Sequence, residues 1–94
     1  MLKLEWLEPA RADLLVIVDY ISDDNPDAAQ RVKDDIEDKV KKLPDFPKIG
    51  RPGRIDGTRE LVAWANYIIV YRESNFAVQI LRILHAAQQW PPSN

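Results

Sequence analysis

The sequence predicts an α+β fold with its elements in the order β-α-α-β-β-β. Three observations predict it: the first residues alternate between apolar and polar side chains, two following segments have helical periodicity, and the last third holds three apolar segments rich in β-branched and aromatic residues. The chain has 94 residues, which is enough for one core and too short for two. We therefore expect a single domain over residues 1–94, with the helices packed on one sheet.

The N-terminal quarter predicts a strand followed by a helix. Leu2, Leu4 and Trp6 alternate with polar neighbours, which is the period of a strand with one buried face. From Pro9 to about residue 22 the apolar positions follow a helical spacing, at Leu14, Ile17, Val18 and Ile21. Pro9 suits the first turn of a helix, where the missing backbone N–H has no partner to lose.

A second helix is predicted from about residue 26 to residue 43, where Pro44 ends it. Asn25 can cap this helix, Pro26 suits its first turn, and Asp27 lies near the positive end of the helix dipole. The buried stripe would consist of Ala29, Val32, Ile36, Val40 and Leu43. Because the turn between the two helices is short, we expect an antiparallel hairpin that buries both stripes on the sheet.

The second half of the chain predicts a long loop and an antiparallel meander. Residues 44–57 contain three prolines and three glycines, so this loop should be stiff, and loops of this length are often functional. Residues 59–64, 67–72 and 77–84 are rich in strand-forming side chains and are separated by short polar breaks. They should form three consecutive antiparallel strands.

The composition limits the chemistry that is available. Hydrophobic residues make up 46% of the chain and charged residues 30%, which is typical of a folded domain. With no cysteine and one histidine, we expect no disulfide, no metal site and no cofactor. The apolar runs are too short to cross a membrane and the first residues do not resemble a signal peptide, so we expect a cytoplasmic protein without a membrane partner.

The charges are distributed unevenly along the chain. The net charge is −2, whereas proteins that bind nucleic acid normally carry a positive field. Acidic residues gather between residues 19 and 45, and the following loop holds Lys48, Arg51, Arg54 and Arg59. The arginine cluster is either a solvated loop or a surface that recognises phosphates or carboxylates. Any contact with a polyanion would therefore be local.

The most specific sequence features lie in the last third, in the segments Gly57-Thr-Arg-Glu-Leu, Asn66-Tyr-Ile-Ile-Val-Tyr-Arg, Ile80-Leu-Arg-Ile-Leu-His and Gln89-Trp-Pro. These segments resemble the RelE/ParE superfamily of type II toxins, and they are nearer the ParE-like branch than the ribosome-dependent nucleases. The resemblance covers nearly the whole chain. It implies a compact toxin whose helical hairpin packs on one face of a curved antiparallel sheet.

RNA cleavage without a metal requires a base, an acid and cations that stabilise the phosphate. The candidates for these roles are Arg59, Glu60, Arg82, His85 and Tyr67. Glu60 could pair with His85 if the strands bring them together. In ribosome-dependent nucleases an arginine usually follows the first tyrosine of the strand that here begins at Tyr67, and this chain has Ile68 instead. Residues 86–89 also lack side chains that titrate or neutralise phosphate. We therefore expect a binding toxin rather than an enzyme.

The residues predicted to contact a target are Arg51, Arg54, Arg59, His85, Gln89 and Trp90. Because Arg59 and Glu60 are neighbours on a strand, their side chains must point to opposite faces. Arg72 and Arg82 lie within apolar strands, where structural ion pairs are expected. His85 alternatively is a strand-end imidazole that a backbone group or an acid satisfies. Trp90 precedes two prolines, so it is either folded back on the domain or presented to a partner.

The resemblance implies a toxin that inhibits DNA gyrase and is neutralised by a cognate antitoxin, with operator DNA bound only through that antitoxin. The antitoxin would lay a helical, partly disordered segment across apolar surface of the helices and the sheet. Two alternatives stay open. One is a metal-independent endonuclease that acts on mRNA at the ribosome, and the other is a degenerate family member that binds antitoxin without being toxic. The fold does not decide among them.

Overall fold

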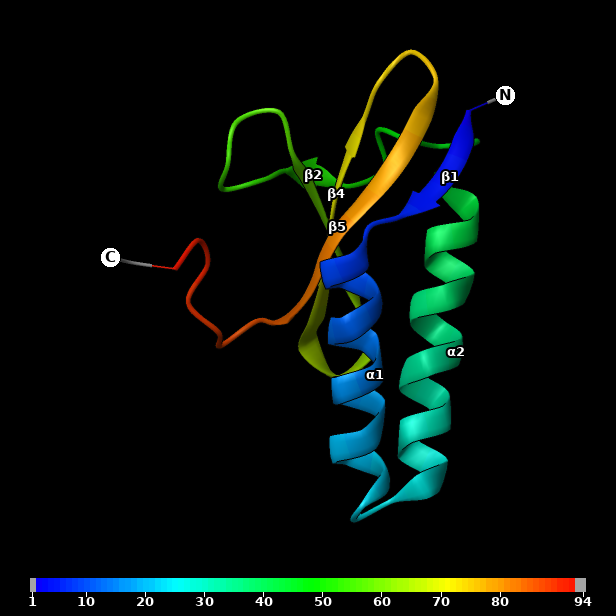
Figure 1. The fold of residues 1–94 in the computed structure, drawn as a ribbon, viewed down its shortest axis with the longest axis vertical. Coiled ribbons are helices and arrows are strands. Elements are labelled where there is room, and N and C mark those ends of the chain that lie inside the picture. The colour runs from blue at the N-terminus through cyan, green and yellow to red at the C-terminus, as the bar shows by residue number, and fades with distance from the viewer. Residues whose placement is uncertain (1, 93–94) are drawn as a thin grey trace.

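The computed structural model describes residues 2–92 and confirms the predicted order of elements with one addition (Figure 1). The elements are β1 (Lys3–Trp6), α1 (Glu8–Ser22), α2 (Pro26–Lys42), β2 (Arg51–Pro52), β3 (Arg59–Ala63), a 3-10 turn (Trp64–Asn66), β4 (Tyr67–Glu73) and β5 (Ala77–His85). The added element is β2, a two-residue strand within the predicted loop. The two helices lie side by side and cover one face of the sheet.

The sheet has five strands in the order β1-β5-β4-β3-β2. Strands β3, β4 and β5 form the antiparallel meander that the sequence predicts, and β2 pairs antiparallel with β3. Strand β1 runs parallel to β5, with Lys3 opposite Ala77 and Trp6 opposite Ile80, so the expected antiparallel sheet is mixed at this edge. The chain that arrives from α2 occupies the outer edge of β3, which leaves the outer edge of β5 for β1.

Helix α2 has the cap and the buried stripe that the sequence predicts. The side chain of Asn25 accepts a hydrogen bond from the backbone N–H of Ala28 at 3.0 Å. The predicted stripe from Ala29 to Leu43 is buried in full. Because these residues recur every three or four positions, one side of the helix packs on the sheet and the opposite side carries its charges.

Helix α1 buries one apolar face and exposes a second one. Ala10 is buried, and Leu14, Ile17 and Ile21 pack against the core. The side chains of Leu15, Val16 and Tyr20 are 72%, 68% and 76% exposed. Within residues 2–92 no element covers this second face, which is defined here by these three residues. Exposed apolar surface of this kind is typical of an interaction site.

Tyr71 holds the first part of the long loop in place. Its hydroxyl accepts a hydrogen bond from the backbone N–H of Gly50 at 2.9 Å and donates one to the carbonyl of Pro47 at 2.8 Å. A Cβ atom at residue 50 would lie 2.6 Å from that hydroxyl, so the approach requires glycine. Burial raises the pKa of Tyr71, which keeps the hydroxyl protonated as a donor. A buried side chain therefore stiffens the loop in addition to its prolines.

The two faces of the sheet carry apolar clusters of different size. Tyr67, Ile69 and Tyr71 belong to the large core under the helices, while Ile68 and Val70 belong to a small cluster on the outer face. The other members of this outer cluster are Leu84, Leu81 and Trp90. Because alternate residues of a strand point to opposite faces, the strand register assigns each candidate residue to one face or the other.

Candidate functional site

The structure does not bring Arg59, Glu60, Arg82 and His85 together at one place, although Glu60 and Arg82 both lie opposite Val70. On β3, Arg59 lies opposite Tyr71 on the helix face and Glu60 lies opposite Val70 on the outer face, as alternation predicts. On β5, His85 lies opposite Tyr67, which belongs to the helix face. Glu60 and His85 therefore occupy opposite faces at different positions along the sheet, and they form no acid/base pair.

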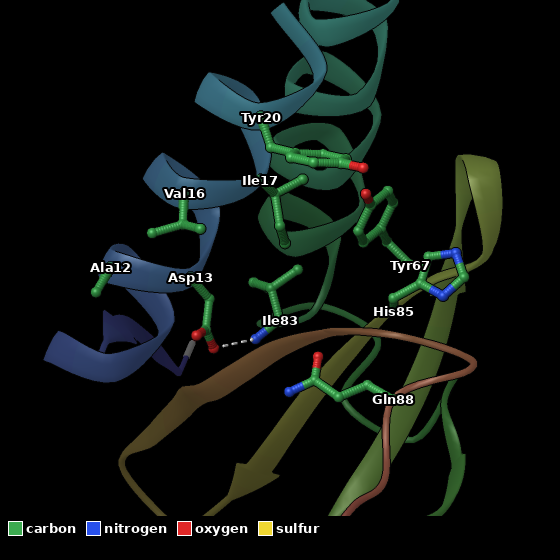
Figure 2. A pocket seen from close by; sticks show the side chains of 9 residues that line it. All are labelled: Ala12, Asp13, Val16, Ile17, Tyr20, Tyr67, Ile83, His85 and Gln88. Atoms are coloured by element: carbon green, nitrogen blue, oxygen red, sulfur yellow. Dashed lines mark hydrogen bonds between the residues drawn. The ribbon is translucent and has the colours of Figure 1, made fainter. Parts of the chain in front are cut away.

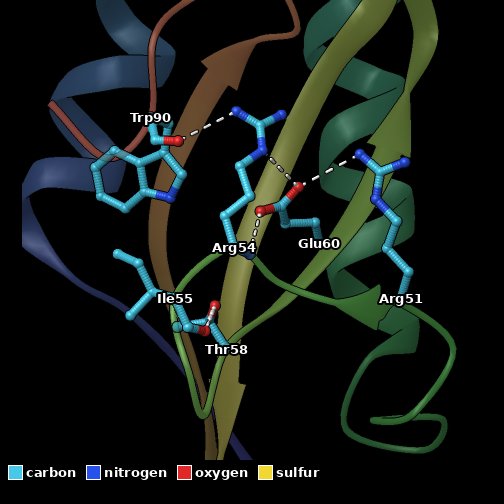
Figure 3. Close-up of polar contacts among 6 residues, drawn as sticks. All are labelled: Arg51, Arg54, Ile55, Thr58, Glu60 and Trp90. Atoms are coloured by element: carbon cyan, nitrogen blue, oxygen red, sulfur yellow. Dashed lines mark hydrogen bonds and ion pairs between the residues drawn. The ribbon is translucent and has the colours of Figure 1, made fainter. Parts of the chain in front are cut away.

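Glu60 is a buried carboxylate that organises the arginines of the loop (Figure 3). Its Oε2 accepts a hydrogen bond from the backbone N–H of Arg54 at 3.0 Å. Its Oε1 accepts one from Nη2 of Arg51 at 3.3 Å and lies 3.6 Å from Nε of Arg54. A carboxylate with only 2% of its surface exposed is costly unless it is paired and hydrogen-bonded. These three partners explain why an acid can occupy the outer face of β3.

Arg82 is held in the structural ion pair that the sequence predicts. Its Nε and Nη2 donate to the two carboxylate oxygens of Asp13 at 2.7 Å and 3.0 Å. Oδ2 of Asp13 also accepts the backbone N–H of Ile83 at 2.9 Å, so α1 caps the edge of β5 beyond the end of β1. The hydrogen bonds to Asp13 raise the pKa of Arg82 above its ordinary value. This ion pair engages Nε and Nη2 of the guanidinium.

His85 is exposed at the end of β5 and has one backbone partner. Its Nδ1 accepts a hydrogen bond from the N–H of Ala87 at 3.1 Å. Its ring meets the ring of Tyr67 edge to face, with centroids 5.3 Å apart and planes at 84°. Both contacts orient the imidazole.

The residues predicted to contact a target fall into separate regions. Arg51, Arg54 and Trp90 come together on the outer face, where Nη1 of Arg54 donates to the backbone carbonyl of Trp90 at 3.4 Å (Figure 3). Arg59 lies on the other face and donates to the carbonyl of Gly50 at 2.8 Å. His85 is at the far end of β5, and Gln89 is exposed in the tail that follows.

The C-terminal tail folds back on the outer face, which is one of the two arrangements expected for Trp90. The indole packs on the outer cluster, and the guanidinium carbon of Arg82 lies 5.5 Å from the centroid of its ring. Its Nε1 is buried and has no hydrogen-bond partner within the described part of the chain. Trp90 therefore completes a small apolar layer and holds the tail against Arg54 and Arg82.

A groove of about 400 Å³ lies between α1 and the ends of β4 and β5 (Figure 2). Val16 and Tyr20 of the second apolar face are part of its α1 wall. Its remaining lining comes from Ala12, Asp13, Ile17, Tyr67, Ile83, His85 and Gln88. Burial raises the pKa of Tyr67, so this phenol stays neutral in the groove. The stripe predicted for α1 does not include the groove residues Val16 and Tyr20, although the apolar residues Leu15 and Val16 outside the stripe were a signal for the groove.

Residues 2–92 offer neither a metal site nor a membrane-spanning helix. Among them, no group of three or more His, Cys, Asp or Glu side chains is arranged to hold a metal ion. No helix within residues 2–92 is long and apolar enough to cross a membrane.

Comparison with known proteins identifies the family. A family model described as the ParE toxin of the type II toxin-antitoxin system parDE matches residues 4–90. The chain belongs to the ParE toxin family. Membership in a toxin-antitoxin family implies that this toxin has an antitoxin partner.

Two relatives and one solved structure agree with this assignment. The toxin is 49% identical over 90 residues to toxin Y4kP of Sinorhizobium fredii, and this alignment covers 95% of the present chain and 93% of the relative. It is 38% identical over 88 residues to toxin RelE2 of Caulobacter vibrioides, and this alignment covers 94% of the present chain and 99% of the relative. A structure of the chromosomal ParDE system from P. aeruginosa matches with a TM-score of 0.79 and 32% identity, over 88% of this toxin and 94% of that chain.

Proposed function

We propose that this toxin acts by binding, that its target is DNA gyrase, and that a cognate antitoxin neutralises it. The placement of Glu60 and His85 on opposite faces of the sheet is the observation that supports a binding mechanism. Glu60 and Arg82 are engaged in structural pairs, and Ile68, at the position of the nuclease arginine, is buried. An RNA phosphate would meet no assembled acid, base and cation. Gyrase as the target is what membership in the ParE family suggests.

The second apolar face of α1 and the adjoining groove are the surface that we assign to the antitoxin. Leu15, Val16 and Tyr20 would be removed from water by the apolar side of an amphipathic segment. Burial of apolar surface contributes about 25 cal/mol per Å², so covering three large side chains is a substantial part of a stable complex. The groove can accept one further side chain between α1 and the sheet.

The target is tested by two assays on the same purified toxin. We expect it to inhibit supercoiling by purified gyrase and to accumulate cleaved DNA, while translation in vitro continues. Adding the antitoxin should restore supercoiling. Translation-dependent mRNA cleavage with unaffected gyrase would contradict the proposal and favour the nuclease. Inactivity in both assays with intact antitoxin binding would identify a degenerate member of the family.

His85→Gln separates the two mechanisms at one residue. A binding toxin loses at most one neutral hydrogen bond, worth about 0.5–1.5 kcal/mol or roughly 2- to 12-fold in affinity. A nuclease that uses its only imidazole for proton transfer would lose about 100-fold or more in rate. We therefore expect His85→Gln to retain most growth inhibition at matched expression. Abolished toxicity in a well-folded variant would count against the binding mechanism.

A further inference from the structure

The outer face of the sheet carries an ordered pair of exposed cations. The side chains of Arg51 and Arg54 are 57% and 39% exposed, while both reach the same buried carboxylate of Glu60. One carboxylate compensates one guanidinium, so one positive charge remains at the surface. Each guanidinium engages Glu60 through a single nitrogen, which holds the planar groups in place and leaves N–H groups for an external anion. Such a pair would lose little side-chain entropy on binding that anion.

The charges of the whole molecule orient a polyanion toward this pair. Residues 8–43, which form the helical layer, contain ten acidic and six basic residues, whereas residues 44–92 contain four acidic and six basic ones. The helices cover the opposite face of the sheet from the arginine pair. A polyanion is therefore repelled by the hairpin and attracted to the outer face.

A third cation lies on the same face. Arg72 follows Val70 by two positions on β4, and Val70 is the residue opposite Glu60. Arg72 is exposed, and its Nε donates to Oε1 of Gln79 at 2.8 Å. The ion pair expected for Arg72 is therefore not found among the described residues, because the neighbouring strand offers an amide at this position. Cations distributed over one face match the repeated phosphates of a nucleic acid, whereas one carboxylate of a protein would need only one guanidinium.

We propose that Arg51 and Arg54 clamp backbone phosphates of duplex DNA and that Glu60 is the residue that positions them. The inference rests on the proposed function in one respect, because the DNA that we have in mind is the DNA bound by gyrase. The contact is weak by itself, since few phosphates are neutralised and the net charge of the toxin is −2. It adds to affinity when the target already holds the DNA near the toxin.

The first test measures binding of a fluorescent 20-base-pair duplex by anisotropy over a series of low salt concentrations. We expect Arg51→Gln/Arg54→Gln to weaken binding about tenfold or more and to lower the slope of log K against log salt by about 2. Arg11→Gln/Arg31→Gln removes the same charge from exposed positions on the hairpin and should change binding less than about twofold. Equal losses in the two double variants would overturn the clamp, because bulk charge alone would then explain the binding.

For Glu60→Gln, non-specific attraction and the clamp predict opposite changes in DNA affinity. This variant makes the toxin more positive by one charge, so non-specific attraction to DNA would become stronger. A clamp that depends on Glu60 for its geometry predicts weaker binding instead. Arg51→Lys/Arg54→Lys keeps the charge and removes the planar groups, so it should also weaken binding several-fold. This variant replaces Glu60→Gln as the test if circular dichroism shows that Glu60→Gln is unfolded. Tighter binding by a folded Glu60→Gln, or unchanged binding by the lysine variant, would overturn the proposal.

The outcomes distinguish this inference from the proposed function. A toxin that binds the duplex through these arginines but leaves gyrase unaffected contradicts the proposed function and leaves the clamp standing. Full inhibition of gyrase by Arg51→Gln/Arg54→Gln overturns the clamp and leaves the proposed function standing. Absence of duplex binding at low salt, with loss of antitoxin affinity in the arginine variant, would show that the pair binds a protein carboxylate and would overturn the clamp.

Discussion

Asp35 joins α2 to the connection between β3 and β4. Its Oδ2 accepts a hydrogen bond from the backbone N–H of Trp64 at 2.7 Å, and its Oδ1 accepts one from Nζ of Lys39 at 2.7 Å. Partial burial by itself would raise the pKa of Asp35, but the hydrogen bonds from Lys39 and Trp64 outweigh it and leave the pKa below its ordinary value. The folded protein therefore favours the charged form of this residue.

We predict that Asp35→Asn lowers the free energy of unfolding by about 1–2 kcal/mol at pH 7, because a charge-assisted hydrogen bond is lost. The folded pKa lies below the unfolded value of about 3.9, so the contribution of the carboxylate is present above that value and is lost as the pH falls through the folded pKa. The difference between variant and wild type should therefore shrink in acid. Urea denaturation at stepwise lower pH measures it, with the exposed Asp34→Asn as control. A difference that did not change with pH would contradict this account.

Single residues were predictable where only alternation or spacing was needed. The opposite orientations of Arg59 and Glu60 and the cap by Asn25 follow from local rules. The partners of buried charges were not predictable, because they depend on the tertiary path. Asp13 is 69 residues from Arg82, and no local pattern connects them. For the same reason the sequence did not show that Glu60 organises the loop arginines instead of facing His85.

At the scale of elements, the connection between β3 and β4 contains a strained residue. Ala65 and Asn66 have φ angles of 61° and 64°. Asparagine tolerates this region, whereas the Cβ of alanine makes it unfavourable by about 1–2 kcal/mol. We predict that Ala65→Gly raises the free energy of unfolding by about 0.5–1 kcal/mol after the greater flexibility of glycine in the unfolded chain is counted. Urea denaturation should show a smaller gain for Asn66→Gly, and a loss of stability in Ala65→Gly would refute the explanation.

Elements with a strong period were predicted close to their observed bounds, and elements that need a partner were not. Helix α2 was expected at residues 26–43 and spans Pro26–Lys42, because its cap, stripe and terminating proline agree. Strand β2 has two residues and exists only because the loop reaches β3. The parallel direction of β1 depends on which sheet edge remains open after β2 to β5 have formed. No sequence period carries that information.

At the scale of the whole molecule, the exposed apolar surface of α1 should decide complex formation. We predict that Val16→Asp leaves the domain folded, because the side chain is exposed, and weakens antitoxin binding at least tenfold, because an unpaired charge would be buried in the interface. Phe76→Asp is a matched control, since Phe76 is also an exposed apolar residue and lies in the turn between β4 and β5. Calorimetric titration with the antitoxin measures both. Equal affinities for Val16→Asp and wild type would place the antitoxin elsewhere.

The parallel pairing of β1 with β5 also determines when the toxin can become native. Trp6 pairs with Ile80, and Glu5 accepts a hydrogen bond from Gln79, 74 residues later. Contacts between such distant parts of a chain slow folding, because a long loop must close before they form. During synthesis, at about 5–20 residues per second, the first strand waits for nearly the entire chain to leave the ribosome. If the antitoxin binds α1 as we propose, an antitoxin that is already present in the cell has several seconds in which to meet the emerging helix before the toxin is native.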